Sequence, residues 1–420
     1  MKRIVSLFFV VILVLNMTSC EIEAVIDSIK NKAGFIFNIY EEVLVPWEAD
    51  EFDIDSDHNK LDEEDYYRYD EMSRSEREIY DIVRNSVGIG ANIIDLSEYS
   101  SEPEDIERIF RCFLADNPQL FYVSRNCHYM YDRASGFVTH LLLKYTDGEV
   151  TDEFDGNCQL IKTADREVIS DKIDDLEDTV EDILEKVPSD CLPVEKEKII
   201  CDYLVENIVY IDTDNDFDAD ETIPHEYDVY GALCKGEAVC EGYAKAFQLL
   251  CYMCGINAIQ VEGTGNGDDH MWNAVDLDGW YYVDVTWNDI GESDYPYYTY
   301  FNVTEEEIEK DHYIDDSVLD VPDCDSDEYS YYNCFAAKVV DLFSEPLNYK
   351  RVADDINLGK CDYVILYANG ITLTDSYLEK YFLSDSSVFN QYARSMGYNI
   401  DLKWEYYIID NYYYIPVNKR

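Results

Sequence analysis

The sequence predicts an α+β protein, in which helices and short strands follow one another without a repeat of fixed period. Residues 166–187 carry apolar side chains at helical spacing, which indicates an amphipathic helix. The stretch "GFVTHLLLKYT" (136–146) is typical of a strand, and residues 268–289 are typical of two strands around a tight turn. Residues 325–420 mix short helices with Tyr-rich strands such as "YVILYA", which favours a small C-terminal α/β or α+β domain.

The N-terminus has the pattern of a secretory signal. Lys2 and Arg3 precede an apolar stretch, residues 4–17, that is too short to span a bilayer comfortably. The stretch ends in "MTSC", which resembles the lipobox of a bacterial lipoprotein. We therefore expect residues 1–19 to be removed and Cys20 to carry a lipid that anchors the protein to the cell membrane, facing outside. The alternative is an ordinary cleaved signal that leaves a free Cys20.

An acid-rich stretch follows the signal, and we interpret residues 20–72 as an acidic tether. Part of it imitates a calcium-binding loop, although His58 stands where the sharp turn of such a loop needs Gly. The candidate calcium ligands are Asp53, Asp55, Asp57, Asn59 and Glu64. A second acidic run, residues 211–221, departs further from the calcium pattern, so a solvated segment is the preferred interpretation of both.

The rest of the chain divides into three predicted parts. These are an N-terminal α+β region at 73–190, a segment at 191–315 that carries the candidate catalytic residues, and the C-terminal domain at 325–420.

Charge and cysteine content exclude some classes of function. The chain has 32 basic and 90 acidic residues, a net charge of −58, and losing Lys2 and Arg3 with the signal leaves 30 basic residues and a net charge of −60. Such a surface repels phosphates, so no nucleic-acid partner is expected. The 13 cysteines show no regular spacing outside "CYMC" (251–254). A chain of this size folds without disulfides, so we expect mostly buried thiols. Because the sequence lacks the spacing of metal ligands, we expect no metal site, and we expect no cofactor.

One cysteine stands apart because it begins a predicted helix. In "GEAVCEGYAKAF" (236–247), Cys240 lies between Gly236 and Gly242, which permit close approach of the backbone. An apolar stripe continues from Cys240 to Cys254 at helical spacing, which predicts a helix buried along one face. The N–H groups at a helix N-terminus favour a thiolate and could hold an oxyanion. The alternative is that Cys240 is one more small core residue.

Two residues downstream could serve a catalytic cysteine. His270 is one of 6 histidines and could act as its base, and Asp284 could orient that base. In a hairpin, two even-numbered residues share a face only if the loop between the strands has an odd length. We therefore expect a loop of three or five residues near 276–280, with Thr286 on the same strand face as Asp284.

These blocks, in this order, resemble the transglutaminase-like superfamily as found in bacterial exported proteins. The resemblance is carried by "AVCEGYAKAFQLLCYMCGI", "HMWNAV" and "YYVDVTW", with "CDYLVENIVYI" before them and "YFNVTEEEIEKDH" after, so it covers roughly residues 195–312. It implies a papain-like cysteine-protease fold, in which a central helix that carries the Cys packs on an antiparallel sheet. It also implies Cys240 as nucleophile, His270 as general base and acid, and Asp284 as the residue that orients the His.

The activity implied by the resemblance is acyl transfer or hydrolysis at the amide bonds of a peptide or protein substrate, through a thioester. Hydrolysis is the simpler expectation, because cross-linking needs a site that excludes water and admits an amine. The alternative is a non-enzymatic surface module that uses the same fold to bind peptide or cell-wall polymer.

Three aromatic residues are weaker candidates for the cleft. Trp272 and Trp287 could roof the active site or pack the sheet. Tyr230 could donate to an oxyanion or simply be one of the chain's 38 tyrosines.

Overall fold

The computed structural model describes most of the chain from residue 58 onward. Described are residues 58, 60–62, 65–211, 225–289, 298–315, 319–335, 352–353, 356, 363–367, 372–398, 400–402, 406–409 and 412–419. The predicted signal, Cys20, the candidate calcium ligands and all of the second acidic run except Ile211 lie outside these ranges. The chain divides into two compact units, 1–47 and 48–420, and every described residue belongs to the second. No helix in the described ranges has the length and apolarity that a membrane crossing requires.

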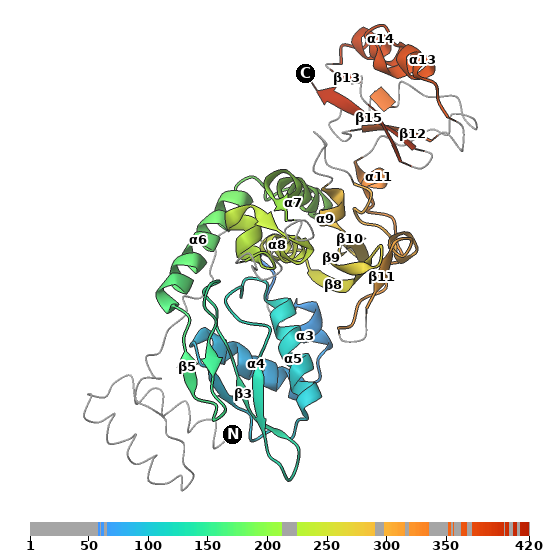
Figure 1. Cartoon of the computed structure of the whole chain (residues 1–420). Helices are drawn as coiled ribbons and strands as arrows, with labels where there is room; N and C mark the ends of the chain where they lie inside the picture. Colours follow the sequence, from blue (N-terminus) through green and yellow to red (C-terminus); the bar gives the residue numbers. More distant parts are fainter. Residues whose placement is uncertain are drawn as a thin grey trace. The chain divides into compact units, whose positions relative to one another are not determined.

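The N-terminal region combines helices with a small antiparallel sheet (Figure 1). Helices α4 and α5 pack against each other, and strand β3 pairs with β1 on one side and β2 on the other. A capping box of Ser73 and Glu76 begins α4. The elements are α3 (Tyr67–Glu71), α4 (Arg74–Gly88), β1 (Ile93–Asp95), α5 (Pro103–Asp116), β2 (His128–Tyr131), β3 (Val138–Leu142), β4 (Glu153–Phe154) and β5 (Leu160–Lys162).

The end of the predicted acidic tether belongs to this packed region. Tyr66, Arg68 and Met72 are buried, and the ring of Tyr66 stacks on Tyr252 with 4.5 Å between centroids. Arg68 Nη2 donates to the backbone oxygen of Gln260 at 2.6 Å. The prediction of a tether that reaches residue 72 is therefore wrong. Aromatic and methionine side chains bury enough apolar surface here to order a stretch whose charge alone suggests a solvated linker.

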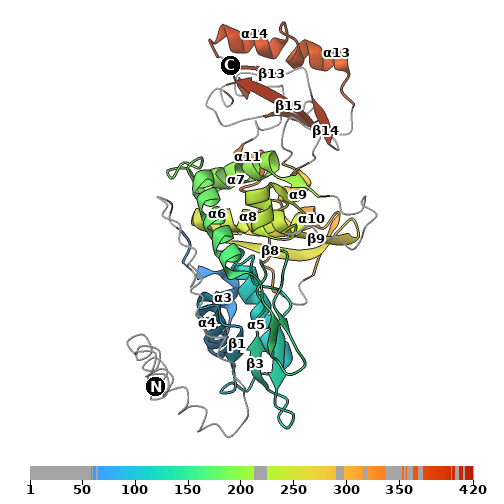
Figure 2. The ribbon, with the colours of Figure 1, turned by 60° about the vertical axis from the view of Figure 1, so that its left-hand side comes forward.

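The core places helix α8 (Cys240–Met253) against a four-stranded antiparallel sheet of order β10-β9-β8-β11, as Figures 1 and 2 show. The sheet consists of β8 (Ala258–Gly265), β9 (Asp268–Asp276), β10 (Trp280–Val283) and β11 (His312–Ile314). Helices α6 (Arg166–Leu184), α7 (Pro193–Asn207) and α9 (Val285–Asn288) pack against α8. Shorter elements complete the core: β6 (Val209–Tyr210), the π-helical turn η3 (Gly231–Lys235), β7 (Glu237–Ala238), α10 (Glu305–Ile308) and α11 (Tyr331–Cys334).

Helix α8 is more deeply buried than its sequence predicts. Between Cys240 and Met253, only Cys240 and Lys245 are not buried. The apolar stripe predicts one buried face, and this expectation is wrong because α6, α7 and the sheet surround the helix. Its polar residues accordingly bond inside the protein: Gln248 Nε2 donates to the backbone oxygen of Ala115 at 2.9 Å.

The hairpin β9–β10 confirms the loop predicted from residue parity. Asp276 pairs with Trp280, which leaves the three residues 277–279 as the loop. Strand β10 ends at Val283, however, and Asp284 caps α9 by accepting from the backbone N–H of Trp287 at 3.0 Å. The expectation that Thr286 continues the strand is therefore wrong, because the Asp284 side chain starts a helix there.

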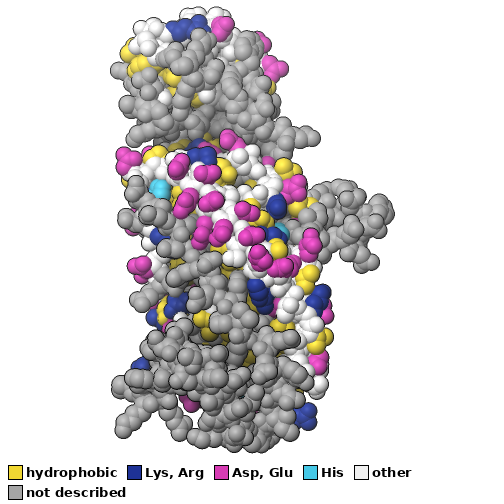
Figure 3. Space-filling view, turned by 90° about the vertical axis from the view of Figure 1, so that its left-hand side faces the viewer, with side chains coloured by type: hydrophobic (Ala, Val, Ile, Leu, Met, Phe, Trp, Pro, Cys, Tyr) yellow, Lys and Arg dark blue, Asp and Glu magenta, His cyan; other side chains and the backbone are white. Residues whose placement is uncertain are grey.

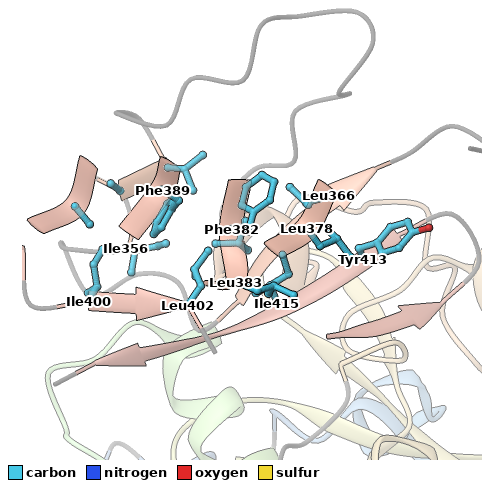
Figure 4. Packing of buried hydrophobic residues seen from close by; sticks show 14 of the residues in the cluster. Ile356, Leu366, Leu378, Phe382, Leu383, Phe389, Ile400, Leu402, Tyr413 and Ile415 are labelled. Carbon is cyan, nitrogen blue, oxygen red and sulfur yellow. The ribbon is translucent and has the colours of Figure 1, made fainter. Parts of the chain in front are cut away.

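The C-terminal domain is a small unit of helices and strands with its own core, as predicted, and its described strands all pair antiparallel, which makes it α+β. Strand β15 pairs with β12, β13 and β14, and apolar side chains from the helices, among them Phe382 and Phe389, gather over Leu402 and Ile415 (Figure 4). The elements are β12 (Tyr363–Tyr367), α13 (Asp375–Leu378), η4 (Glu379–Leu383), α14 (Val388–Ser395), β13 (Ile400–Leu402), β14 (Tyr407–Ile409) and β15 (Tyr412–Lys419).

The acidic composition is visible on the described surface. Figure 3 shows Asp and Glu side chains gathered across the middle of one face, with few Lys or Arg side chains among them. Helix α6, whose residues 166–184 include a large share of acids, lies on that side of the molecule in Figure 1. This face repels anions and attracts cations.

Candidate active site

Cys240 is the first residue of α8, and its side chain is half-buried. The first N–H groups of a helix have no intrahelical partner, so they remain available beside the thiol. Gly242 packs tightly under this turn, because an added Cβ would lie 2.6 Å from the Cβ of Ala238. The π-helical turn ahead ends in Gly236, whose φ of +72° favours glycine. Gly236 thus allows the backbone turn before Cys240, and Gly242 allows the close packing after it.

His270 on β9 joins Cys240 to an acid. Its Nε2 lies 2.8 Å from Asp284 Oδ2, and Cys240 lies close enough to raise the pKa of the ring. Because Nε2 faces the carboxylate, Nδ1 is the nitrogen left for the thiol. Burial opposes protonation of the ring, but the interactions with Asp284 and Cys240 outweigh it and raise the pKa of His270 to about 9. The three residues that the sequence predicts to act together are therefore brought together.

Asp284 is fully buried and accepts three hydrogen bonds. Oδ1 receives the backbone N–H of Trp287, and Oδ2 faces the Nε2 atoms of both His270 and His312. Burial alone would raise the pKa of this carboxyl, but the hydrogen bonds from the two histidines lower it. Asp284 is thus an ionised carboxylate that holds the ring of His270 in place.

His312 is the member of this cluster that the sequence does not predict. It begins β11, which pairs with β8, and its Nε2 lies 3.1 Å from Asp284 Oδ2. The other ring nitrogen, Nδ1, lies 2.7 Å from Asp311 Oδ1. The available signal is the pair Asp311-His312 in the trailing segment, where a rare His directly follows an acid.

Strand β8 leaves room for these rings by carrying two glycines. A Cβ on Gly265 would lie 2.7 Å from the ring of Trp287 and 3.2 Å from that of His270. A Cβ on Gly263 would lie 2.0 Å from the backbone oxygen of Tyr313. Any side chain at these positions would displace the neighbouring strand or the histidine.

Cys240 and His270 line a cavity of about 950 Å³. Its opposite wall comes from the N-terminal region, including Phe121, Arg125 and Tyr129. Arg125 Nη1 reaches across to Glu241 Oε2 at 2.9 Å, so the residue after Cys240 is clamped by the N-terminal region. The cavity lies at the upper end of the ~300–1,000 Å³ typical of ligand pockets. The sequence does not predict this wall, because it depends on contacts between distant segments.

The aromatic residues predicted near the cleft do not line this cavity. Trp272 is buried in the sheet core and its ring stacks with that of His270, with 5.8 Å between centroids. Trp287 packs against His270 and His312, with 5.3 and 4.3 Å between centroids. Both therefore pack around the histidines instead of roofing the cleft. The hydroxyl of Tyr230 donates to Asp175 at 3.2 Å, which argues against a role as oxyanion donor.

Metal and cofactor binding have little support among the described residues. The ligand-type atoms of His270, Asp284 and His312 lie within 4.8 Å of one another. The Nε2 atoms of both histidines, however, stand at hydrogen-bond distance from Asp284 Oδ2, so these atoms already satisfy one another. The eleven described cysteines are free thiols, and Cys251 and Cys254 are buried in or beside α8.

Comparison with known proteins identifies part of the chain. Over 61 residues it is 38% identical to the kyphoscoliosis peptidases of Mus musculus and Homo sapiens, a stretch that is 11% of this chain and 9% of each relative. A solved structure of a candidate cysteine protease from Cytophaga hutchinsonii is 14% identical, with a TM-score of 0.21, over 38% of this chain and 61% of that one. A solved TGase is 15% identical, with a TM-score of 0.26, over 59% and 63%.

At TM-scores this low, neither structure adds support for the fold. The family model carries the assignment: residues 177–285 match the transglutaminase-like superfamily, and this range includes Cys240, His270 and Asp284. Residues 177–285 are therefore a transglutaminase-like domain, which confirms the resemblance seen in the sequence.

Proposed function

We propose that the protein is an exported, lipid-anchored cysteine enzyme that acts on amide bonds of peptides or proteins through Cys240, His270 and Asp284. One observation carries the proposal: His270 is hydrogen-bonded with the buried Asp284 and lines the same cavity as Cys240, which begins a helix. A thiol, a base and an acid that orients the base are the parts that a cysteine nucleophile needs. The adjoining cavity supplies space for a substrate.

The proposed chemistry has two steps. The thiolate of Cys240 attacks the amide carbonyl carbon, the C–N bond breaks, and His270 gives its proton to the leaving amine, which leaves a thioester. Water then attacks the thioester, His270 takes a proton from it, and the C–S bond breaks to release a carboxylic acid. The N–H groups at the start of α8 stabilise the oxyanion in both steps.

Hydrolysis is the proposed outcome. The cavity wall carries several charged side chains, among them Glu107, Asp269 and Arg111. Such a wall binds water, and water competes with an amine for the thioester. Transfer would show as incorporation of a labelled amine into a peptide product, and a product that gains only water supports hydrolysis.

The anchor is proposed from the N-terminal sequence. A bacterial cell fed a labelled fatty acid is expected to incorporate the label into the protein, and Cys20→Ala is expected to abolish incorporation. Label retained in the variant would contradict lipidation at Cys20.

Alkylation by iodoacetamide at different pH values tests the enzyme proposal. An ordinary thiol reacts slowly well below its pKa of about 8.5. Cys240 is expected to react fast at pH 6, because the imidazolium of His270 stabilises the thiolate, and His270→Ala is expected to slow it at least tenfold. Peptide mass spectrometry measures labelling at each cysteine separately.

The same cavity contains a matched control thiol. Cys127 also lines it, and burial raises the pKa of its thiol to about 11. Cys127 is expected to react slowly at every pH up to 9 and to be unaffected by His270→Ala. If Cys240 reacts no faster than Cys127, the enzyme proposal is wrong and a binding module becomes the better hypothesis.

A further inference from the structure

His312 occupies a closed position behind the candidate triad. Its side chain is fully buried, and its two ring nitrogens each face a carboxylate: Nε2 lies 3.1 Å from Asp284 Oδ2 and Nδ1 lies 2.7 Å from Asp311 Oδ1. Asp311 is partly exposed, and its other oxygen accepts the hydroxyl of Tyr300 at 2.7 Å. The arrangement is thus a chain from the surface to His270 through Asp311, His312 and Asp284.

The hydrogen-bond inventory fixes the protonation that this arrangement needs. A neutral imidazole has one N–H and one bare nitrogen, whereas a carboxylate only accepts. A neutral His312 would therefore place a bare nitrogen against a carboxylate oxygen on one side, with no proton between them. An imidazolium, with two N–H groups, satisfies both contacts.

The aromatic surroundings favour the same charge. The rings of Trp272, Trp287 and Tyr300 lie with their centroids 4.9, 4.3 and 5.3 Å from that of His312. Aromatic faces attract cations, most strongly where water is excluded. A buried cation here is offset by two carboxylates and by these rings.

We propose that His312 is a positioning residue, held as an imidazolium between Asp284 and Asp311, and that its charge limits how tightly Asp284 holds the proton on His270. The inference rests on the proposed function, because the proton on His270 matters only if His270 serves Cys240. The two histidine rings share one oxygen of Asp284, with 5.5 Å between their centroids. A cation at that distance disfavours a second cation on His270.

The direction of the effect follows from the groups that face the two histidines. Burial opposes the protonated form of His270, and Asp284 and Cys240 favour it. A charge on the ring of His312, with its centroid 5.5 Å away, adds to the opposition. Asp311 and the hydroxyl of Tyr300 lie on the far side of His312. Without His312, burial alone offsets Asp284, so His270 keeps its proton to higher pH and is less often in the neutral form that accepts a proton from the attacking water.

The first test observes His312 directly. In the full chain labelled with ¹⁵N-histidine, the imidazole of His312 is expected to show two protonated nitrogens at pH 7. Asp311→Asn keeps an acceptor but removes the charge, so a larger share of His312 is expected to carry one bare nitrogen at pH 7 in this variant. One bare nitrogen on His312 at pH 7 in the unmodified protein would overturn the inference.

The second test measures the rate of Cys240 alkylation against pH. For a thiolate–imidazolium pair, the plot of alkylation rate against pH has two transitions. The transition at higher pH reports loss of the His270 proton and is expected near pH 9. In His312→Gln the upper transition is expected to move by about one pH unit to higher pH. A purely structural role would change the amplitude and leave the midpoint where it was. Glu306→Gln, which removes an exposed charge on the nearby α10, is the matched control and is expected to leave it unchanged.

The outcomes separate the two proposals. If the unmodified protein shows both transitions and His312→Gln shifts neither, the inference is wrong while the proposed function stands. If Cys240 shows only an ordinary thiol transition, the proposed function is wrong. If His312→Gln does not fold by circular dichroism, the NMR measurement with Asp311→Asn decides the inference.

Discussion

Buried polar side chains distinguish the transglutaminase-like core from the C-terminal domain. In the core, Asn273, Asp284 and His312 are buried, and Asp284 is hydrogen-bonded with both His270 and His312. In the described part of the C-terminal domain, Ser387 and Asn390 are the buried polar residues, and both bond to backbone groups. Burying a polar side chain is unfavourable unless it is hydrogen-bonded. A network of buried polar side chains therefore indicates a region where these residues serve function and not stability.

The largest expected effect is confined to the core. Cys240→Ser removes the thiolate, and the rate of peptide cleavage is expected to fall at least ~1,000-fold while the protein stays folded. Cleavage is measured by mass spectrometry of a mixed peptide library. Cys127→Ser, at the other thiol of the cavity, is expected to retain activity. Equal losses in both variants would indicate that the cavity, and not the nucleophile, was damaged.

Phe382→Ala tests whether the active site depends on the stability of the C-terminal domain. The side chain is fully buried in the C-terminal core, so truncation is expected to lower the free energy of unfolding of that domain by about 3–5 kcal/mol. Alkylation of Cys240 at pH 6 is expected to stay unchanged, because the domain has its own core. Lys380→Ala, on the exposed surface of the same helical segment, is the control. Slower alkylation in Phe382→Ala alone would show that the C-terminal domain supports the active site.

The features that the sequence predicts, in both the core and the C-terminal domain, are local ones. Cys240, His270 and Asp284 are predictable because each belongs to a local pattern: Cys240 begins a helix, His270 lies near the start of a strand, and Asp284 directly follows the paired strand. The three-residue hairpin loop is predictable because side chains alternate along a strand, so residue parity decides it. The C-terminal domain of helices and strands follows from short apolar runs between turns.

His312 and the cavity wall are not predictable in this way. His312 lies 28 residues after Asp284, and the two meet only because β11 pairs with β8 on the far edge of the sheet. Arg125 meets Glu241 across 116 residues. The sequence also does not predict the packing of Tyr66 on the core. Acidic residues dominate the composition of that segment, whereas its aromatic side chains decide its structure.

Gly263→Ala is expected to have an intermediate effect. A Cβ there would meet the backbone of Tyr313, which a rotamer change cannot relieve, so the free energy of unfolding is expected to fall by about 1–3 kcal/mol. Displacing β11 would also move His312. Gly88→Ala at the end of α4 has open space around it and is expected to be neutral or slightly stabilising. Chemical denaturation measures both, and similar losses in the two variants would contradict the packing argument.

Raising the pH is expected to slow the proposed reaction less than Cys240→Ser does. The pKa of His270 is raised to about 9, so its acid form, which protonates the leaving amine, persists up to that pH. The rate of acylation is expected to fall as pH rises through about 9, tending toward tenfold per pH unit. A fall that begins near pH 6.5 would mean that Asp284 and Cys240 do not hold the proton on His270.

Two buried asparagines give the closest comparison between the regions. Asn273 donates to the backbone oxygens of Ala244 in α8 and Ile259 in β8, whereas Asn390 bonds to Phe382 and Leu402 within the C-terminal domain. Replacing either with Ala is expected to lower the free energy of unfolding by about 1–2 kcal/mol, because buried backbone groups lose partners.

Only Asn273→Ala is expected to slow alkylation of Cys240, because Asn273, unlike Asn390, ties the cysteine-bearing helix to the sheet that carries His270. A two- to threefold change at pH 6 is enough to distinguish the variants. An equal change in Asn390→Ala would mean that loss of stability anywhere in the chain reaches the site. An unchanged rate in both would mean that the other contacts of α8 hold Cys240 and His270 in place without Asn273.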